Sequence, residues 1–360
     1  MLKLFLSWFL VKVETGFKGE DTLSATKLSE KATTGNMLNL RSLLTESPMA
    51  PPLLTLIVGF ILFSLFVPHF ASMRTMTGII NAASINAIVV IGVTMLMISG
   101  EFDLSVGAMV AMGGYIFASM TLDGGSPAVA VIATLAVTAV MGGINGWLTI
   151  GTGIPSFIVT LGTRSIYRAA VWIVSGGGML QAAEKLPIYE MFSGRLDLIN
   201  NLFERANFRT VTIWALLLGL LLQLVLTRTR FGNQVFATGG NPGAAMAQGV
   251  KTKLVKLISF TLTGFLAGVA GIMTFSQFTT VFVATATNLE LTAIASAVVG
   301  GTLLTGGVGS IIGGLIGILI INMLRTGVVL LGLPSDNFEA IVGVAIIGAA
   351  IINEYIRRRS

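Results

Sequence analysis

The side chains that most often perform catalysis or bind metals are scarce in this sequence. The 360 residues include no cysteine and a single histidine, His69. Thiolate nucleophiles, disulfides and Cys-based metal sites are therefore excluded, and one histidine alone cannot build a metal centre. No nucleophile is paired with a base inside the apolar segments. We therefore predict no catalytic residues, no metal and no cofactor bound by this chain.

Two acidic motifs share one spacing. Asp103-Leu-Ser-x-x-Ala, ending in Gly113-Gly114, matches Glu290-Leu-Thr-x-x-Ala, ending in Gly300-Gly301, without a gap. Ile144-Asn145 likewise recurs as Ile321-Asn322. Both acids suit helix N-termini, where a carboxylate accepts N–H bonds and complements the helix dipole. Capping is the favoured interpretation for each acid, and it is compatible with solute contact. Candidate pathway residues are Asp103, Ser105, Asn145, Glu290, Thr292 and Asn322.

The composition decides the class of protein that must position these residues. Hydrophobic residues make up 54% of the chain, charged residues 11%, and the mean hydropathy is +0.88. Soluble domains have about 25% charged residues, so this chain cannot coat a soluble surface. Its 43 glycines suit helices that pack closely in lipid. We predict an all-α fold, a polytopic transmembrane helical bundle.

Ten segments approach the roughly 20 apolar residues that a helix needs to cross a bilayer. The third and the eighth fit least well. Residues 1–50 are predicted to be a cytoplasmic tail, partly disordered, and residues 51–360 the transmembrane domain. The ten predicted spans are 52–69, 76–99, 104–121, 127–150, 156–175, 210–227, 254–276, 290–305, 309–331 and 338–356.

Basic residues near the segment ends predict the orientation, because cytoplasmic loops retain Lys and Arg in excess. Ten spans with both termini in the cytoplasm place two basic clusters there, 228–256 and 357–359. The external loop 176–209 then carries basic and acidic residues that partly balance. If segments three and eight were re-entrant loops, the 228–256 cluster would be external, which this charge pattern disfavours.

The matching motifs predict an internal repeat with halves at about 76–175 and 254–356. Corresponding segments lie five crossings apart, and an odd number reverses their direction in the membrane. Many transporters build a solute pathway from such an inverted repeat. Chance similarity between Gly- and Ala-rich segments is the alternative.

The loop after the sixth segment predicts a short helix. Asn241 suits the N-cap, Pro242 the first helical position and Gly249 the residue after the helix. Such a helix in a basic cytoplasmic loop is placed to dock a soluble partner. A plain connecting turn is the alternative.

Four stretches resemble the inner-membrane permeases of bacterial ABC importers for ribose and related sugars. The resemblance spans about residues 50–356. The stretches are Ile98-Ser-Gly-Glu-Phe-Asp-Leu-Ser-Val-Gly107, Pro155-Ser-Phe-Ile-Val-Thr-Leu-Gly-Thr163, Thr229-Arg-Phe-Gly through Gly249, and Ala297-Val-Val-Gly-Gly-Thr302 with Gly306-Gly-Val-Gly-Ser310.

The resemblance implies a multi-pass subunit of the bacterial inner membrane that works as a homodimer or as a heterodimer with a similar permease. It also implies cytoplasmic ATP-binding subunits and a periplasmic solute-binding protein as partners. The loop helix would couple ATP use to transport. One departure is Gly243-Ala244-Ala245, where the family often has Glu-Ala-Ala, which puts a specific salt bridge to the ATPase in doubt. The implied coupling residues are Gly239, Gly240, Asn241, Pro242, Ala244, Ala245 and Gly249.

Two other classes remain as alternatives. An ion- or proton-coupled secondary transporter uses the same kind of repeat, but this chain has few ionisable residues in mid-span, with Arg164, Arg168 and Arg325 near span ends. An intramembrane enzyme would need a nucleophile and base that the sequence lacks. No G-x-x-x-x-G-K-[ST] loop occurs, so any ATP must be hydrolysed by another chain.

Overall fold

The computed structural model describes residues 50–334, 340, 343–344 and 347–348. The chain divides into two parts, 1–43 and 44–360, and every described residue belongs to the second. The predicted tail therefore lies outside the described residues, except Ala50. The predicted tenth span, 338–356, lies outside them apart from five isolated positions.

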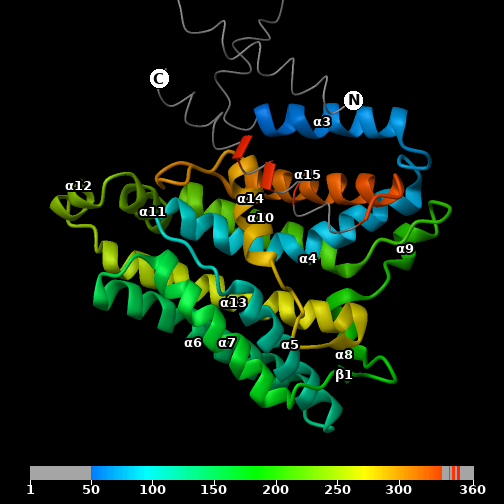
Figure 1. Cartoon of the computed structure of the whole chain (residues 1–360), viewed down its shortest axis with the longest axis horizontal. Helices are drawn as coiled ribbons and strands as arrows, with labels where there is room; N and C mark the ends of the chain where they lie inside the picture. Colours follow the sequence, from blue (N-terminus) through cyan, green and yellow to red (C-terminus); the bar gives the residue numbers. More distant parts are fainter. Residues whose placement is uncertain (1–49, 335–339, 341–342, 345–346, 349–360) are drawn as a thin grey trace, which may run out of the picture. The chain divides into compact units, whose positions relative to one another are not determined.

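The described part is a bundle of helices with one two-stranded sheet (Figure 1). In the strands β1 (Leu180–Gln181) and β2 (Thr280–Val281), Leu180 pairs with Val281 and Gln181 with Thr280, antiparallel. The helices are α3 (Ala50–Phe66), α4 (Met73–Ile98), α5 (Val106–Leu122), α6 (Pro127–Thr152), α7 (Ser156–Ser175), α8 (Pro187–Ser193), α9 (Asp197–Asn200), α10 (Thr210–Arg228), α11 (Arg230–Gly240), α12 (Pro242–Ala247), α13 (Thr252–Phe278), α14 (Leu289–Val299) and α15 (Ile311–Leu330).

Six of these helices are long and apolar enough to cross a membrane: α4, α6, α7, α10, α13 and α15. Three shorter apolar helices, α3, α5 and α14, coincide with the first, third and eighth predicted spans. Of the two segments predicted to be the weakest, the eighth forms the shortest of these three helices, whereas α5 of the third is as long as α3, with 17 residues each. At about 1.5 Å per residue, the 11 residues of α14 rise only about 16 Å.

The predicted end of the eighth segment, residue 305, is wrong as a helix boundary, because α14 ends at Val299. Gly301 has a φ of +90°, which leaves the right-handed helical region. A Cβ at Gly300 would overlap the backbone of Gly313 in α15, so the chain needs glycine there to pass so close. The segment therefore continues as irregular backbone up to α15.

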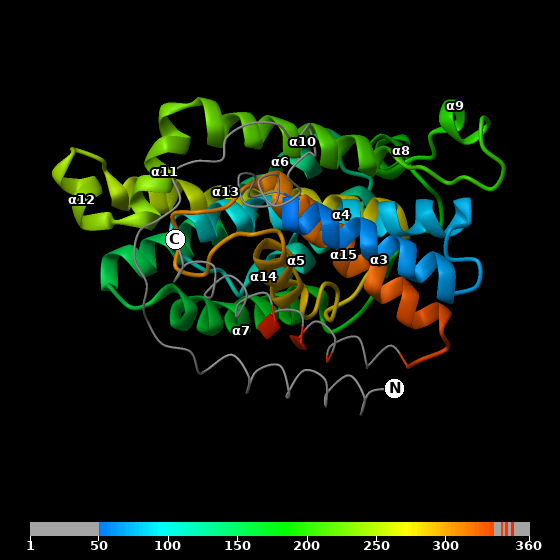
Figure 2. The same cartoon turned by 90° about the horizontal axis from the view of Figure 1, so that it is seen from above.

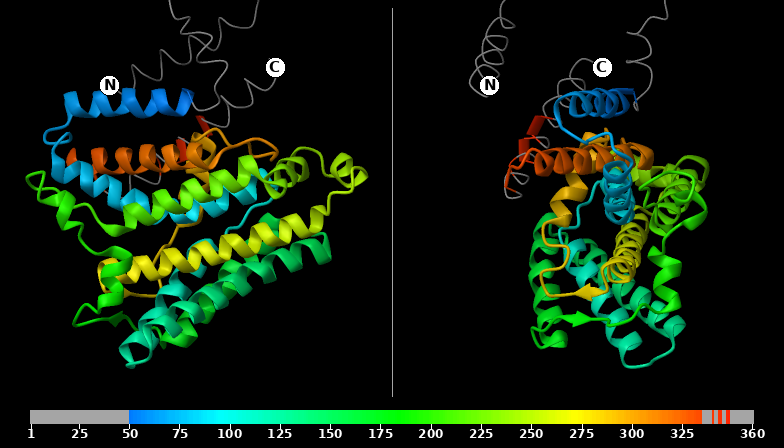
Figure 3. Two further views of the ribbon diagram at one scale, coloured as in Figure 1. Left: turned by 180° about the vertical axis from the view of Figure 1, so that it is seen from behind. Right: turned by 90° about the vertical axis from the view of Figure 1, so that its right-hand side faces the viewer.

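Helices α4 and α13 form the centre of the bundle (Figures 2 and 3). In their most apolar windows, 83% of α4 and 67% of α13 residues are buried, against 28% for α6 and 22% for α7. Helices α5 and α6 pack against α13, and α14 and α15 pack against α4. The outer helices keep large exposed apolar side chains, as a lipid-facing surface requires.

The bundle has two distinct ends, which Figure 1 shows at its left and right sides. The α12 end holds α11, α12, the start of α13 and the link 98–105 that follows α4. The α9 end holds α8, α9 and the strand pair. Asn81, near the start of α4, donates from Nδ2 to the carbonyl of Asn207, which fixes that helix start at the α9 end.

Glycines allow the backbones of α6 and α13 to touch. A Cβ at Gly264 would overlap the carbonyl oxygen of Thr138 and would lie 3.0 Å from the Cα of Gly142. Gly271 likewise packs against the backbone of α5, where its Cβ would lie 2.5 Å from the carbonyl oxygen of Val110. In lipid, such close packing replaces the hydrophobic drive between helices.

We predict that Gly264→Ala lowers the Tm of the purified protein in detergent by several degrees. Overpacking costs about 1–3 kcal/mol, and each kcal/mol shifts Tm by about 2–4 °C in domains of 150–250 residues. Gly78→Ala in α4 is the matched control, because a Cβ there meets nothing within 4 Å. An equal fall in Tm for both variants would contradict the packing argument.

Candidate functional site

Asp103 lies fully buried in the link between α4 and α5. Its Oδ1 accepts bonds from the backbone N and from Oγ of Ser105, both at 2.7 Å. Its Oδ2 accepts from Nδ2 of Asn145 on α6 at 3.0 Å. The carboxylate therefore organises the turn before α5, whose N-cap residue is Ser105, and also joins α6.

Asn145 extends this hydrogen-bond network to α7. Its Nδ2 also donates to Oγ of Ser105 at 2.8 Å, and its Oδ1 accepts from the hydroxyl of Tyr167 at 3.1 Å. The same hydroxyl lies 2.8 Å from the carbonyl oxygen of Met141. Buried polar groups that satisfy one another in this way fix the relative positions of their helices.

Glu290 lies in the first turn of α14 and is 1% exposed. Nη2 of Arg164 on α7 lies 2.7 Å from its Oε1 as an ion pair, with the arginine side chain 32% exposed. Among the described residues, neither carboxylate oxygen has an aligned hydrogen-bond partner. A buried carboxylate normally accepts several such bonds, so Glu290 retains acceptor capacity.

The two acids lie in the same region of the fold. Gly107, four residues after Asp103, faces Glu290, and a Cβ at Gly107 would lie 2.5 Å from its Oε2. Glycine at this position therefore makes room for the carboxylate of α14 beside α5.

Helix α7 connects both halves of this region. Arg168 donates from Nη1 to the carbonyl oxygens of Val283 and Thr285, at 2.5 and 2.9 Å, in the segment before α14. Residues 164, 167 and 168 share one helical face by their i, i+3 and i+4 spacing. We call the whole set the polar cluster: Asp103, Ser105, Asn145, Arg164, Tyr167, Arg168 and Glu290.

Two of the predicted pathway residues do not join the polar cluster. Oγ1 of Thr292 donates to the carbonyl of Asn288 at 3.2 Å, and Nδ2 of Asn322 to that of Ile318 at 2.9 Å. Each bond stays on or beside the residue's own helix. Asn322 therefore does not do for Glu290 what Asn145 does for Asp103, although the sequence aligns the two asparagines.

Sequence reasoning did not select Arg164, Tyr167 and Arg168 as site residues. Its placement of Arg164 and Arg168 near span ends was wrong, because both lie in the middle of α7. The available signal was their i, i+3, i+4 spacing within an apolar helix, where charged residues face the protein interior. Which carboxylate they would face could not be read from the helix itself.

The predicted loop helix is confirmed as α12. Oδ1 of Asn241 accepts from the backbone N of Ala244 at 3.0 Å, Pro242 opens the helix, and Gly249 follows it with φ +80°. Ala245 is 5% exposed, whereas Met246 is 55% exposed. The outer surface of α12 is therefore available to a partner, and Ala245 packs inward.

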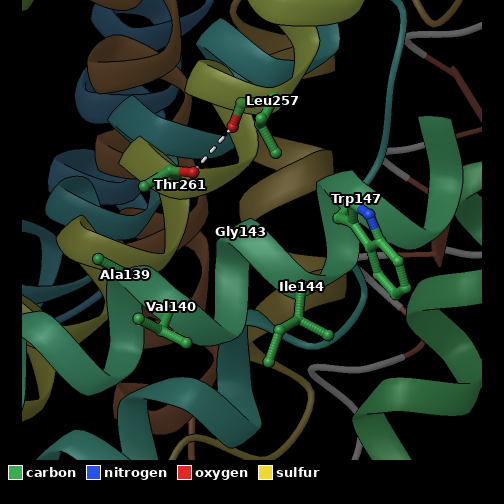
Figure 4. Close-up of a pocket in the computed structure, with 7 residues that line it drawn as sticks. All are labelled: Ala139, Val140, Gly143, Ile144, Trp147, Leu257 and Thr261. Atoms are coloured by element: carbon green, nitrogen blue, oxygen red, sulfur yellow. Dashed lines mark hydrogen bonds between the residues drawn. The ribbon is translucent and has the colours of Figure 1, made fainter. Parts of the chain in front are cut away.

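A groove of about 430 Å³ lies between α6 and α13, away from the polar cluster (Figure 4). Its one hydroxyl, that of Thr261, already donates to the carbonyl of Leu257 at 2.9 Å, and Trp147 adds an indole N–H. Ala139, Val140, Gly143, Ile144 and Trp147 form its α6 wall. This largely apolar lining offers few hydrogen-bond partners to the hydroxyl groups of a polar solute.

The polar cluster has the chemistry of a binding site rather than of a catalytic one. Carboxylates, an amide, a phenol and guanidinium groups can exchange hydrogen bonds with a polar solute. Within the part of the chain that the structure describes, no three His, Cys, Asp or Glu side chains come together to hold a metal ion.

Comparisons with known proteins identify the family. Residues 75–350 match the family model described as branched-chain amino acid transport system / permease component. No solved structure gives a significant match.

The curated relatives are named as permease proteins of import systems. The chain is 32% identical over 308 residues to the autoinducer 2 import system permease protein LsrC of Salmonella typhi, covering 86% of each chain. It is 32% identical over 305 residues to the ribose import permease protein RbsC of Bacillus subtilis, covering 84% of this chain and 91% of the relative. For RbsC of Escherichia coli K12 the values are 31% over 302 residues, 83% and 91%.

The family consists of transport permeases, not enzymes. With its apolar crossing helices, its buried polar cluster and a family match over most of its length, this chain belongs to the family of membrane-embedded permease components of such transport systems.

Proposed function

We propose that this chain forms the translocation pathway of an ABC importer for a sugar or a related small polar solute. The observation that carries the proposal is the polar cluster, in which the buried carboxylate of Glu290 keeps unused acceptor capacity beside Asp103. Hydroxyl groups of a sugar are donors that suit such acceptors. The names of the relatives, which specify ribose and autoinducer 2, support this class of solute.

The proposal needs separate ATP-binding subunits, because the sequence lacks a phosphate-binding loop. Helix α12 is their docking site: Met246 and Ala244 are exposed on it, while Ala245 anchors it to the protein. A periplasmic solute-binding protein delivers the solute. Two copies of this chain, or this chain and a similar permease, complete the assembly.

Helix directions support an inverted repeat with ten crossings. Helix α4 runs from the α9 end to the α12 end, whereas α13 begins beside α12 and ends at β2. The packing also relates the two halves: α5 and α6 of the first half pack on α13 of the second, and α14 and α15 of the second half pack on α4 of the first. In both halves an aligned acid lies close to the start of the short helix: Asp103 is three residues before α5, and Glu290 is the second residue of α14.

The distribution of charge supports a cytoplasmic α12 end and hence cytoplasmic termini. Retention of basic residues on the cytoplasmic side is the strongest orientation signal in membrane proteins. The basic residues at this end are Arg228, Arg230, Lys251, Lys253 and Lys256.

Reconstitution in proteoliposomes tests this function. The chain is combined with the ATP-binding subunits and solute-binding protein of its import system, and uptake of radiolabelled ribose or autoinducer 2 is measured. We expect uptake only when ATP is supplied on the side of the vesicle membrane that the α12 end faces. Uptake driven by a proton or sodium gradient without ATP would instead identify a secondary transporter.

We predict that Glu290→Gln reduces uptake at least tenfold while the ATP-binding subunits still co-purify. The change keeps the shape of the side chain and removes the charge that pairs with Arg164. The control Glu204→Gln alters an exposed acid, 91% exposed in its pair with Arg205, and should leave uptake unchanged.

The double variant Arg164→Gln with Glu290→Gln separates stability from transport. Removing one partner of a buried pair is costlier than removing both, so we expect the double variant to regain part of any Tm lost by Glu290→Gln. Uptake should stay low, because glutamine replaces the charged carboxylate and turns one of its two acceptor oxygens into a donor amide. Recovery of uptake together with Tm would mean that Glu290 has only a structural role.

We also predict that Met246→Asp prevents co-purification of the ATP-binding subunits and leaves membrane insertion intact. A charge at the centre of a docking surface must be desolvated without a partner. Met179→Asp is a matched control, because Met179 is 56% exposed in the segment between α7 and β1. Ala245→Trp should have the same effect as Met246→Asp by displacing α12. Normal co-purification with both α12 variants would exclude α12 as the docking site.

A further inference from the structure

Three segments that are distant in sequence meet at the α12 end, mainly through glycines. They are the link after α4, the C-terminus of α11 and the loop between α14 and α15. The backbone N of Gly307 donates to the carbonyl oxygen of Ile98 at 2.8 Å. We call the five glycines at this meeting point the glycine junction: Gly100, Gly239, Gly240, Gly306 and Gly307.

The glycine junction leaves no room for side chains at its centre. A Cβ at Gly239 would overlap the carbonyl oxygen of Ile98 and would lie 2.6 Å from the N of Gly307. A Cβ at Gly306 would lie 2.8 Å from the Cα of Gly100. Gly100, Gly306 and Gly307 also have positive φ values of +88°, +82° and +75°. Backbone therefore touches backbone, which makes this contact stiff in compression.

Each segment of the junction lies close in sequence to α12, to Asp103 or to the helix of Glu290. Gly240 is separated from α12 by Asn241 alone. Gly100 is three residues before Asp103, and the loop containing Gly306 begins where α14, the helix of Glu290, ends. The junction is thus the point where the α11–α12 segment touches both interrupted crossings.

A second contact runs parallel to the junction. Lys256, in α13 shortly after α12, pairs with Glu101 at 2.5 Å, and both side chains are largely buried. The next residue, Phe102, donates its backbone N to Oγ of Ser156 at the start of α7 at 3.0 Å. A movement at α12 can therefore reach the 101–103 link from α11 and from α13.

We propose that the glycine junction transmits displacement of α12 simultaneously to the Asp103 link and to α14, so that both halves of the polar cluster move together. Gly239 acts as a positioning residue in this step. The inference rests on the proposed docking of ATP-binding subunits on α12. A rigid contact is needed because a flexible one would absorb the movement before it reached the crossings.

The test compares two neighbouring glycines. Gly239→Ala introduces a methyl group that overlaps the link after α4, whereas a Cβ at Gly240 meets only the Cα of Gly307 at an ordinary 3.8 Å. Because the chain has no cysteine, a nitroxide can be placed on α14 alone through Leu291→Cys, an exposed position. The complex with its ATP-binding subunits is held in lipid nanodiscs, and the spectrum is recorded before and after trapping with ATP and vanadate.

We expect trapping to change the α14 spectrum in the parent complex and in Gly240→Ala. In Gly239→Ala, co-purification of the subunits and basal ATP hydrolysis should stay within twofold of the parent, while the spectral change falls at least fivefold. A merely structural role would lower yield and assembly and would not abolish this response selectively. A parent without any spectral change, equal responses in Gly239→Ala and parent, or equal losses in the two alanine variants would overturn the proposal.

If Gly239→Ala does not assemble, the ion pair provides the decisive variants. Glu101→Lys should lose the ATP-dependent spectral change, and the charge swap Glu101→Lys with Lys256→Glu should restore it. Full response in the single variant, or no restoration in the swap, would contradict transmission through this region. Failure of the unmodified chain to bind any ATP-binding subunit would instead reject the proposed function itself.

Discussion

A buried carboxylate in an apolar helical bundle must find hydrogen bonds or an opposite charge, and this requirement organises the centre of the molecule. Asp103 is satisfied by Ser105 and Asn145, so it ties the start of α5 to α6. Within the described part of the chain, Glu290 forms an ion pair with Arg164, and neither of its carboxylate oxygens has an aligned hydrogen-bond partner. The two aligned acids therefore have different surroundings: Asp103 accepts hydrogen bonds from neighbouring side chains and backbone, whereas Glu290 is balanced by an opposite charge.

Helix α7 contributes to the surroundings of both acids from one of its faces. Tyr167 reaches Asn145, while Arg164 and Arg168 reach α14 and the segment before it. Both short helices begin inside the bundle, where free N–H groups and the helix dipole favour negative charge. A polar solute near this point would meet donors and acceptors from three or four helices at once. That arrangement is what a selective yet reversible binding site requires.

Glycine has a second role beyond helix packing in lipid. Between α6 and α13 it brings backbones together and stabilises the bundle. At the α12 end it brings α11 into contact with the link before α5 and the loop after α14, where backbone packs directly on backbone and little movement between the segments is possible. The same residue type thus supports a static interface in one place and a line of mechanical contact in another. The groove between α6 and α13 lies beside the first of these interfaces and is largely apolar.

The sequence by itself determined the membrane class, most helix boundaries to within a few residues, the weakness of the eighth segment and the capped helix α12. These follow from local composition, length and capping, which need no knowledge of distant contacts. The end of α14 was misjudged, because Gly300 is required by the backbone of α15 rather than by its neighbours. Only the tertiary structure decided that Arg164 faces Glu290, that Asn322 stays apart, and that Lys256 meets Glu101 across 155 residues. The physical reason is that hydropathy and periodicity describe which face of a helix is buried, whereas partners depend on which helix is packed against that face.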